Sequence, residues 1–147
     1  MRRRNYPELI NPYEETIARL RTKLSEARLV IIDLMPEEAQ EILRSFHNCE
    51  SREERNNWQA LAVHGIILLA KPIPRQGPFQ LVERAYCPLC GGGSMSLYES
   101  GFSISKGLHR HLLGWGDNRR CQVMEAAVLL ARDHWHDKIE PALRFDG

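Results

Sequence analysis

The longest regular pattern of apolar residues in this 147-residue chain precedes Pro36. Apolar side chains recur there at alternating intervals of three and four residues, which places them on one stripe of an α-helix. The stripe consists of Ile17, Leu20, Leu24, Ala27, Ile31 and Leu34. Asn11 and Glu14 flank Pro12 as a helix cap would, and the residue before Pro36 resists helical backbone. We therefore predict a helix over 11–35 whose stripe packs against neighbouring helices, with a short coiled coil as the alternative.

Two shorter helical patterns follow. Pro36 precedes acidic residues, which are favourable in a first turn, and apolar positions then recur as far as Phe46. Ser51 and Glu54 have the spacing of a capping box and predict the start of a third helix. The side that we expect this helix to bury carries Trp58, Leu61, Ala62, Gly65, Leu68 and Leu69. Residues 1–70 are thus predicted to form a three-helix unit. Its short basic N-terminal arm carries Arg2, Arg3 and Arg4.

A connector and a second unit are predicted beyond the third helix. Three prolines and a glycine fall within residues 71–78, and this composition is typical of an extended linker. The second unit, over 79–147, begins with imperfect alternation at 79–86, which is a strand candidate. Glycines at 91–93 indicate a loop that continues to Ser96.

Two helices are predicted in the second unit. A short one over 106–113 is stopped by Gly114, and a long one runs from about Asn118 to Ile139 before Pro141. The expected apolar face of the long helix is formed by Met124, Ala127, Val128, Ala131 and Trp135. The predicted fold class is therefore mainly α: a three-helix unit, then a metal-binding lobe that ends in a long helix.

Cys87 and Cys90 are separated by two residues, and they give the strongest chemical signal in the sequence. Thiolates are preferred zinc ligands, and a pair at this spacing can face one ion across a tight turn. Pro88 stiffens such a turn, and Gly91 allows the left-handed backbone that points amide groups at the sulfurs. A thioredoxin-like redox pair would need a helix directly after the motif, and the glycines there do not start one. We predict a zinc knuckle.

Phe102, Leu108 and His111 follow the cysteine pair at the spacing F-x5-L-x2-H. In this register, residues 87–121 resemble the C2H2 zinc-finger family. The resemblance implies that the Phe and the Leu form a small core, and that His111 binds zinc from a helix. Cys121 then serves as the fourth ligand, as in C2HC variants.

The segment departs from the finger pattern in its spacings. Eleven residues separate Cys90 from Phe102 where the family has three, and nine separate His111 from Cys121 where the family has three to five. A knuckle opposite a helix start is also similar to a treble-clef arrangement. His109 is the alternative to His111 as the histidine ligand, but the apolar face of their helix favours His111 pointing inward. A thiolate at Cys121 would gain from the positive end of the last helix.

Cations surround an aromatic residue beside these ligands, and together they are the predicted contact residues for a partner. They are Lys106, His109, Arg110, Trp115, Arg119 and Arg120. Cations with an aromatic ring suit phosphates and a stacked base. In the finger family, Ile104 and Gly107 would occupy base-reading positions, and neither carries a donor for reading bases. The expected partner is therefore nucleic acid bound without sequence specificity, or a protein of a nucleoprotein complex.

Two other functions are weighed against nucleic-acid binding. An adaptor or inhibitor, for example one encoded by a phage or mobile element, would occupy a partner's surface. Acidic residues around the second and third helices could face a basic partner. These residues are Glu37, Glu38, Glu41, Glu50, Glu53 and Glu54. The run from Asp133 to Asp137, with His134 and His136, is similar to the core of HNH-type nucleases, but the ten residues after it cannot supply the rest of that site. We predict a protein that is not an enzyme.

Composition and charge say more about the location of the protein in the cell than about its function. The net charge is +1, so global electrostatics does not favour nucleic acid, and any such footprint must be local. No apolar run approaches the roughly 18 residues that span a bilayer, and no apolar segment follows the basic N-terminus. Together with a CxxC pair, this predicts a cytoplasmic protein with bound zinc, no membrane partner and no small-molecule substrate.

Overall fold

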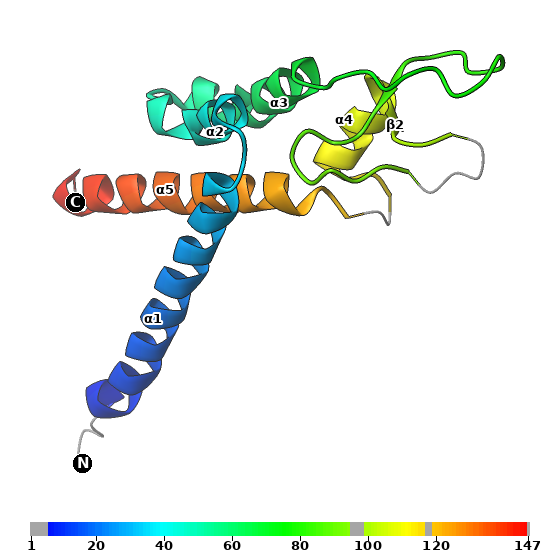
Figure 1. Ribbon diagram of the computed structural model, residues 1–147. Helices are drawn as coiled ribbons and strands as arrows, with labels where there is room; N and C mark the ends of the chain where they lie inside the picture. Colours follow the sequence, from blue (N-terminus) through cyan, green and yellow to red (C-terminus); the bar gives the residue numbers. More distant parts are fainter. Residues whose placement is uncertain (1–5, 95–98, 117–118, 147) are drawn as a thin grey trace.

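Helices make up most of the described chain, which comprises residues 6–94, 99–116 and 119–146 of a computed structural model (Figure 1). The α-helices are α1 (Tyr6–Asp33), α2 (Glu37–Arg44), α3 (Arg52–Leu68), α4 (Lys106–Leu113) and α5 (Gln122–Asp146), and the 3₁₀-helix η1 spans Ser45–Asn48. Strands β1 (Arg84–Ala85) and β2 (Phe102–Ser103) pair antiparallel. The predicted fold class, mainly α, is confirmed. Arg2–Arg4, part of the predicted 91–96 loop and Asn118 itself lie outside the described residues. The last helix begins at Gln122 and not near Asn118, since residues 119–121 are not helical.

The start of α3 follows the predicted capping box. The Glu54 amide donates to the Ser51 hydroxyl at 3.1 Å, and the Glu54 carboxylate accepts from the Ser51 amide at 3.4 Å. These contacts satisfy helix-end donors that have no intrahelical partner. The side of α3 that faces the core carries Trp58, Ala62, Val63, Ile66 and Ile67. Leu61 and Leu68, predicted to be buried, are exposed because they lie on the opposite side of the helix from these residues.

One apolar core joins the segments on the two sides of the predicted connector. Leu43 and Phe46 pack in the same cluster as Leu108, Leu112 and Met124, and all five are buried. The predicted apolar face of α5 is confirmed, since it contributes Met124, Ala127, Val128 and Ala131 to this cluster and places Trp135 against it. The helical unit and the lobe predicted from the sequence therefore share a core.

Aromatic rings tie η1 and α3 to the middle of α5. The Trp58 ring lies edge-on to Phe46 at 5.7 Å and to Trp135 at 5.9 Å between centroids. The Trp135 indole donates to the Phe46 carbonyl at 3.3 Å. On the other side of Phe46, His134 stands edge-on to the His47 ring at 4.5 Å. The last helix is thus fixed by ring packing as well as by its aliphatic face.

Helix α1 departs most from the prediction. It begins at Tyr6 instead of Asn11, and Pro12 lies inside it, because proline removes one helical hydrogen bond but has a φ in the helical range. Every residue from 11 to 24 is exposed, since α1 extends away from the other helices (Figure 1). Among residues 11–33 of α1, whose burial is described, only Ile32 near the C-terminal end is buried. The expected packing of the stripe against neighbouring helices of the same chain is wrong.

Two other predicted boundaries are corrected. The strand expected over 79–86 is reduced to Arg84–Ala85, because β2 offers only two residues for pairing, and Phe79 and Leu81 project from a loop. Helix α5 runs through Pro141 to Asp146, for the same reason that α1 tolerates Pro12. No helix in the described ranges is long and apolar enough to cross a membrane.

Candidate metal centre

Three cysteines and one histidine converge between α3 and the start of α5. The ligand atoms of Cys87, Cys90, His111 and Cys121 all lie within 4.8 Å of one another. Cys87 and Cys121 are buried, His111 is half-buried and Cys90 is exposed. One side of the site is therefore buried in the core, and the other side is open to solvent. All four metal ligands named from the sequence meet at this point.

A knuckle at residues 87–92 places the first two sulfurs. The Cys87 amide donates to the Gly92 carbonyl and the Gly91 amide donates to the Cys87 carbonyl, both at 2.9 Å. Gly91 has φ +72, in the left-handed region that the sequence predicted for it. As a result the Leu89 amide points at the Cys87 sulfur and the Gly92 amide at the Cys90 sulfur, each at 3.4 Å. Such amides stabilise thiolates.

Helix α4 provides the histidine. Leu108 and Leu112 are fully buried, so the helix presents His111 to the cysteines, with its Nε2 3.2 Å from the Cys90 sulfur. The Phe102 ring stacks on the imidazole at 4.4 Å and fixes its plane. His109, the alternative donor, is exposed on another side of the helix. The geometry therefore selects His111.

Cys121 stands directly before α5, where its sulfur meets the free amides of the first turn. Its carbonyl accepts from the Glu125 amide at 2.9 Å, as the carbonyl of a helix-capping residue does. The pKa of Cys121 is lowered to about 4, first by the hydrogen bond from the Cys87 thiol, then by His111 and by the Met124 and Val123 amides. The amides at the start of α5 thus add to the Cys87 hydrogen bond in favouring a thiolate at Cys121.

The pKa values of the other two thiols are shifted upward instead. The pKa of Cys87 is raised by its hydrogen bond to Cys121 and by burial, and that of Cys90 is raised chiefly by burial. Burial and the closeness of the three sulfurs thus disfavour ionising all of them together. A divalent cation would favour the ionised form of all three thiols, because its charge offsets both desolvation and their mutual repulsion.

The donor set fits zinc in type and in spacing. The Cys87 and Cys121 sulfurs are 4.0 Å apart, and the Cys90 sulfur is 3.2 Å from the His111 nitrogen. A tetrahedral zinc ion would hold two sulfurs about 3.8 Å apart, and a sulfur and a nitrogen about 3.6 Å apart. Small shifts therefore convert the observed positions into a Cys3His site. The group can hold a metal ion such as zinc.

Arg84 supports the loop between the knuckle and β2, a role that no pattern in the sequence indicates. Its guanidinium donates to the Gly101 carbonyl at 2.6 Å and to the Ser100 carbonyl at 3.0 Å, and it pairs with Glu99 at 3.1 Å. Ser94 accepts a further bond at 2.7 Å. A lone arginine in a predicted strand gives no pattern by which these loop contacts could have been found.

The predicted contact residues gather around two shallow hollows beside the metal ligands. Lys106, His109, Arg110 and Trp115 line a hollow of about 260 Å³, and Trp115, Arg119 and Arg120 line another of about 380 Å³ together with Glu125. Leu113, Gly114 and Trp115 belong to both. Trp115 is 61% exposed, and the Arg110 guanidinium lies 4.7 Å from the centre of its ring. The six residues are contiguous on the surface.

The residues weighed for nuclease chemistry have other neighbours. Asp133 forms an ion pair with Arg28 at 3.5 Å, and His134 packs against Phe46 and His47. His136 is exposed on α5. In the part of the chain that the structure describes, these side chains form no second cluster of metal-type ligands.

Comparisons with known proteins assign no relative. No protein-family model, no curated protein and no solved structure matches this chain.

Proposed function

We propose that this chain is a zinc-stabilised protein that binds nucleic acid without sequence specificity. The observation that carries the proposal is the stack of Arg110 on the exposed Trp115, at the junction of two hollows. Exposed aromatic rings stack on unpaired bases, and neighbouring cations contact the phosphates between them. We call the set Lys106, His109, Arg110, Trp115, Arg119 and Arg120 the cationic face.

Zinc would act on this face by positioning its two halves. Lys106, His109 and Arg110 lie on α4 with the ligand His111, whereas Arg119 and Arg120 precede the ligand Cys121. The Cys121 amide donates to the His111 carbonyl at 2.8 Å, so the two ligands are also joined through the backbone. An ion bound by both side chains would fix the distance between the two halves, and with it the spacing of phosphate contacts.

Single-stranded nucleic acid is the best match to this face. Ile104 is half-buried and, like Gly107, offers no side-chain donor to a base edge, so α4 is poorly equipped to read a duplex. A tryptophan on the surface needs an unstacked base as its partner. The proposal therefore specifies stacking and phosphate contacts, with no preferred sequence.

The test is fluorescence anisotropy of a labelled single-stranded oligonucleotide, titrated with zinc-loaded protein at several salt concentrations. Arg119→Gln should make the slope of log K against log salt shallower by about 0.7, the value for one phosphate contact on a single strand. Trp115→Ala should lower affinity by roughly 5- to 150-fold and leave the slope unchanged, because stacking contributes about 1–3 kcal/mol.

Arg52→Gln is the matched control, since Arg52 is an exposed arginine on α3, outside the cationic face. It should change neither the affinity nor the salt slope. No binding at low salt and high micromolar protein would reject the proposal. Equal losses for Arg52→Gln and Arg119→Gln would show that only net charge matters.

A second candidate, a protein-binding adaptor, is favoured by a different observation. Phe79 is 89% exposed and Leu81 is 95% exposed on the loop before β1, which projects from the body (Figure 1). Large apolar side chains displayed in this way are typical of contacts with another protein. A host protein that co-purifies in stoichiometric amount, and is lost on Phe79→Ser with Leu81→Ser, would support this function.

A further inference from the structure

We propose that two copies of this chain associate through α1 in a parallel, two-stranded coiled coil. The contact surface, called the α1 seam below, consists of Ile17, Leu20, Leu24, Ala27, Ile31 and Leu34. Its members alternate at intervals of three and four residues, which is the a and d pattern of a heptad repeat. All six are exposed.

Helix α1 lacks the packing that normally maintains a helix. Fourteen consecutive residues, 11–24, are exposed, and α1 meets the body only near its C-terminal end (Figure 1). Helices in proteins draw most of their stability from an apolar face packed against a neighbour. In α1 that face is present in the sequence but has no neighbour within the described chain.

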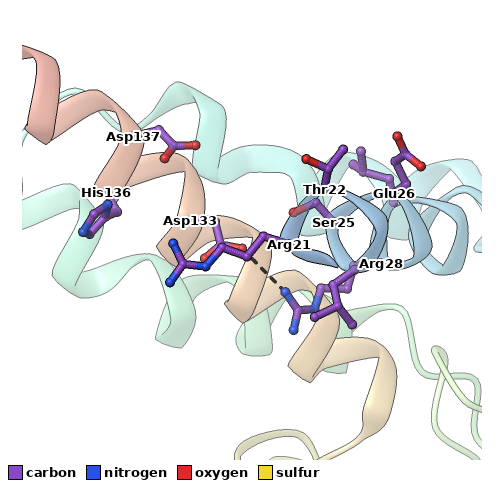
Figure 2. A pocket seen from close by; sticks show the side chains of 10 residues that line it. Arg21, Thr22, Ser25, Glu26, Arg28, Asp133, His136 and Asp137 are labelled. Atoms are coloured by element: carbon purple, nitrogen blue, oxygen red, sulfur yellow. Dashed lines mark ion pairs between the residues drawn. The ribbon is translucent and has the colours of Figure 1, made fainter. Parts of the chain in front are cut away.

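The side of α1 that packs against α5 differs from the side that carries most of the α1 seam. Ile32 is buried, and Arg28 pairs with Asp133 of α5 across a hollow of about 570 Å³ (Figure 2). At 3.6 residues per turn, this side lies roughly 100° around the helix from the α1 seam. Leu24 of the seam also lines this hollow, but it stays 51% exposed. The seam can therefore receive a second helix while α1 keeps its contact with α5. The Leu34 amide donates to the Val30 carbonyl at 3.1 Å, so helical geometry extends to the last member of the seam.

The side chains of the seam favour a second copy in parallel. The a positions hold Ile17, Leu24 and Ile31, and the d positions hold Leu20, Ala27 and Leu34, so two of three a residues are β-branched and two of three d residues are leucine. β-Branched residues at a with leucine at d favour two parallel strands. Identical helices in this arrangement place each seam residue opposite its own copy, so both surfaces have matching apolar positions.

Charges beside the seam are compatible with this pairing. In a parallel coil the flanking partners are Thr16 with Arg21 and Lys23 with Arg28 of the other copy. The second pair is like-charged, but the Arg28 guanidinium already lies 3.5 Å from Asp133 in its own chain, and its side chain is only 22% exposed. Figure 2 shows it directed at Asp133 of α5. The fold thus offsets the charge that would oppose self-association.

The seam is short, so the dimer should be weak. A specific interface generally buries at least about 1,000 Å² in total, and a coil of three heptads is near this limit. We expect a dissociation constant on the order of 10 µM. An interface of this small area gains little more free energy than is lost in translational and rotational entropy on association. Sedimentation velocity of the full, zinc-loaded chain across that range should show a monomer–dimer equilibrium.

Two variants separate the seam from other exposed apolar residues. Leu20→Glu should abolish the dimer, because it places two like charges face to face in a d layer. Leu61→Glu is the matched control, since Leu61 is an exposed leucine on α3 outside the seam, and it should leave the dimer unchanged. A wild-type chain that stays monomeric at concentrations well above the expected constant overturns the proposal, as does a Leu20→Glu chain that still dimerises.

Orientation needs its own measurement. A photo-crosslinking residue at Thr16 should react with the segment around Arg21 of the other copy in a parallel dimer. In an antiparallel dimer with the whole seam paired, it would react near Glu37. Cross-links to the latter segment would overturn the parallel arrangement.

Discussion

The sulfur of Cys121 lies 4.0 Å from that of Cys87, although 34 positions separate the two residues in the chain. This contact joins the knuckle to the start of α5. We expect Cys121→Ser to abolish stoichiometric zinc binding, because three remaining ligands of a structural site bind far more weakly. The melting temperature should fall by on the order of 10 °C, from a loss of about 3 kcal/mol or more.

Zinc content by mass spectrometry and unfolding by circular dichroism would measure both effects. Cys49→Ser is the matched control, because Cys49 is a half-buried thiol outside the Cys3His group. It should retain one zinc ion per chain. A chelator should reproduce the effect of Cys121→Ser on the wild type, and unchanged helical content and melting after chelation would contradict a structural role.

Two histidines on one short helix should behave in opposite ways. His111→Ala should lose zinc, because it removes a nitrogen that lies 3.2 Å from the Cys90 sulfur. His109→Ala should keep zinc, because His109 is exposed elsewhere on α4. The absorption of the cobalt-substituted proteins would distinguish the two, since tetrahedral thiolate coordination gives characteristic bands. Loss of these bands in His109→Ala but not in His111→Ala would reverse the ligand assignment.

Acid should destabilise the contact between η1 and α5. The pKa values of His47 and His134 are both lowered, first by burial and then by positive neighbours that include Lys138. The folded state therefore binds fewer protons than the unfolded one, and the free energy of unfolding rises with pH. The contribution is complete above the ordinary histidine value and is lost as the pH falls from about 6.5 toward the lowered values.

Chemical denaturation at pH 7 and pH 5 would measure this loss. His134→Phe keeps a ring against Phe46 but cannot be protonated, so the difference between the two pH values should shrink. His64→Gln is the control, since His64 is exposed on α3, and it should preserve the wild-type difference. Zinc release at low pH affects all three proteins alike, so the comparison between them isolates His134. An undiminished pH effect in His134→Phe would refute the assignment.

Gly101 should tolerate no side chain. It has φ +79, and a Cβ there would lie 2.9 Å from the Ala85 carbonyl oxygen in β1. We expect Gly101→Ala to cost at least about 2 kcal/mol, from left-handed strain and from the displaced strand. Gly77 lies in open space, so Gly77→Ala should change the free energy of unfolding by less than about 1 kcal/mol. Equal effects in urea denaturation would contradict this account.

Local signals in the sequence predicted the local parts of the structure. The capping box at Ser51, the knuckle around Gly91 and the end of α4 at Gly114 each depend on a few neighbouring residues and on known backbone preferences. The metal ligands were also predictable, because cysteine spacing and the apolar face of α4 restrict which side chains can meet. The finger-like register identified His111 before its position was known.

The predictions that depended on long-range packing were less successful. Periodicity shows that α1 has an apolar stripe but not what covers it, and the assumption that the same chain does so was wrong. Pro12 and Pro141 predict helix boundaries, yet each removes only one hydrogen bond, and both lie inside long helices. The role of Arg84 depends on loop carbonyls that no sequence pattern marks.

Helix α1 and its partner α5 are made at very different times during translation. Arg28 and Asp133, which join them, are 105 positions apart, so α1 emerges from the ribosome long before its docking site exists. At a translation rate of roughly 10 residues per second, the delay is about ten seconds. Throughout that interval the seam of one nascent chain is free to meet the seam of another on the same messenger. The position of α1 in the chain thus favours pairing during synthesis, before either body has folded.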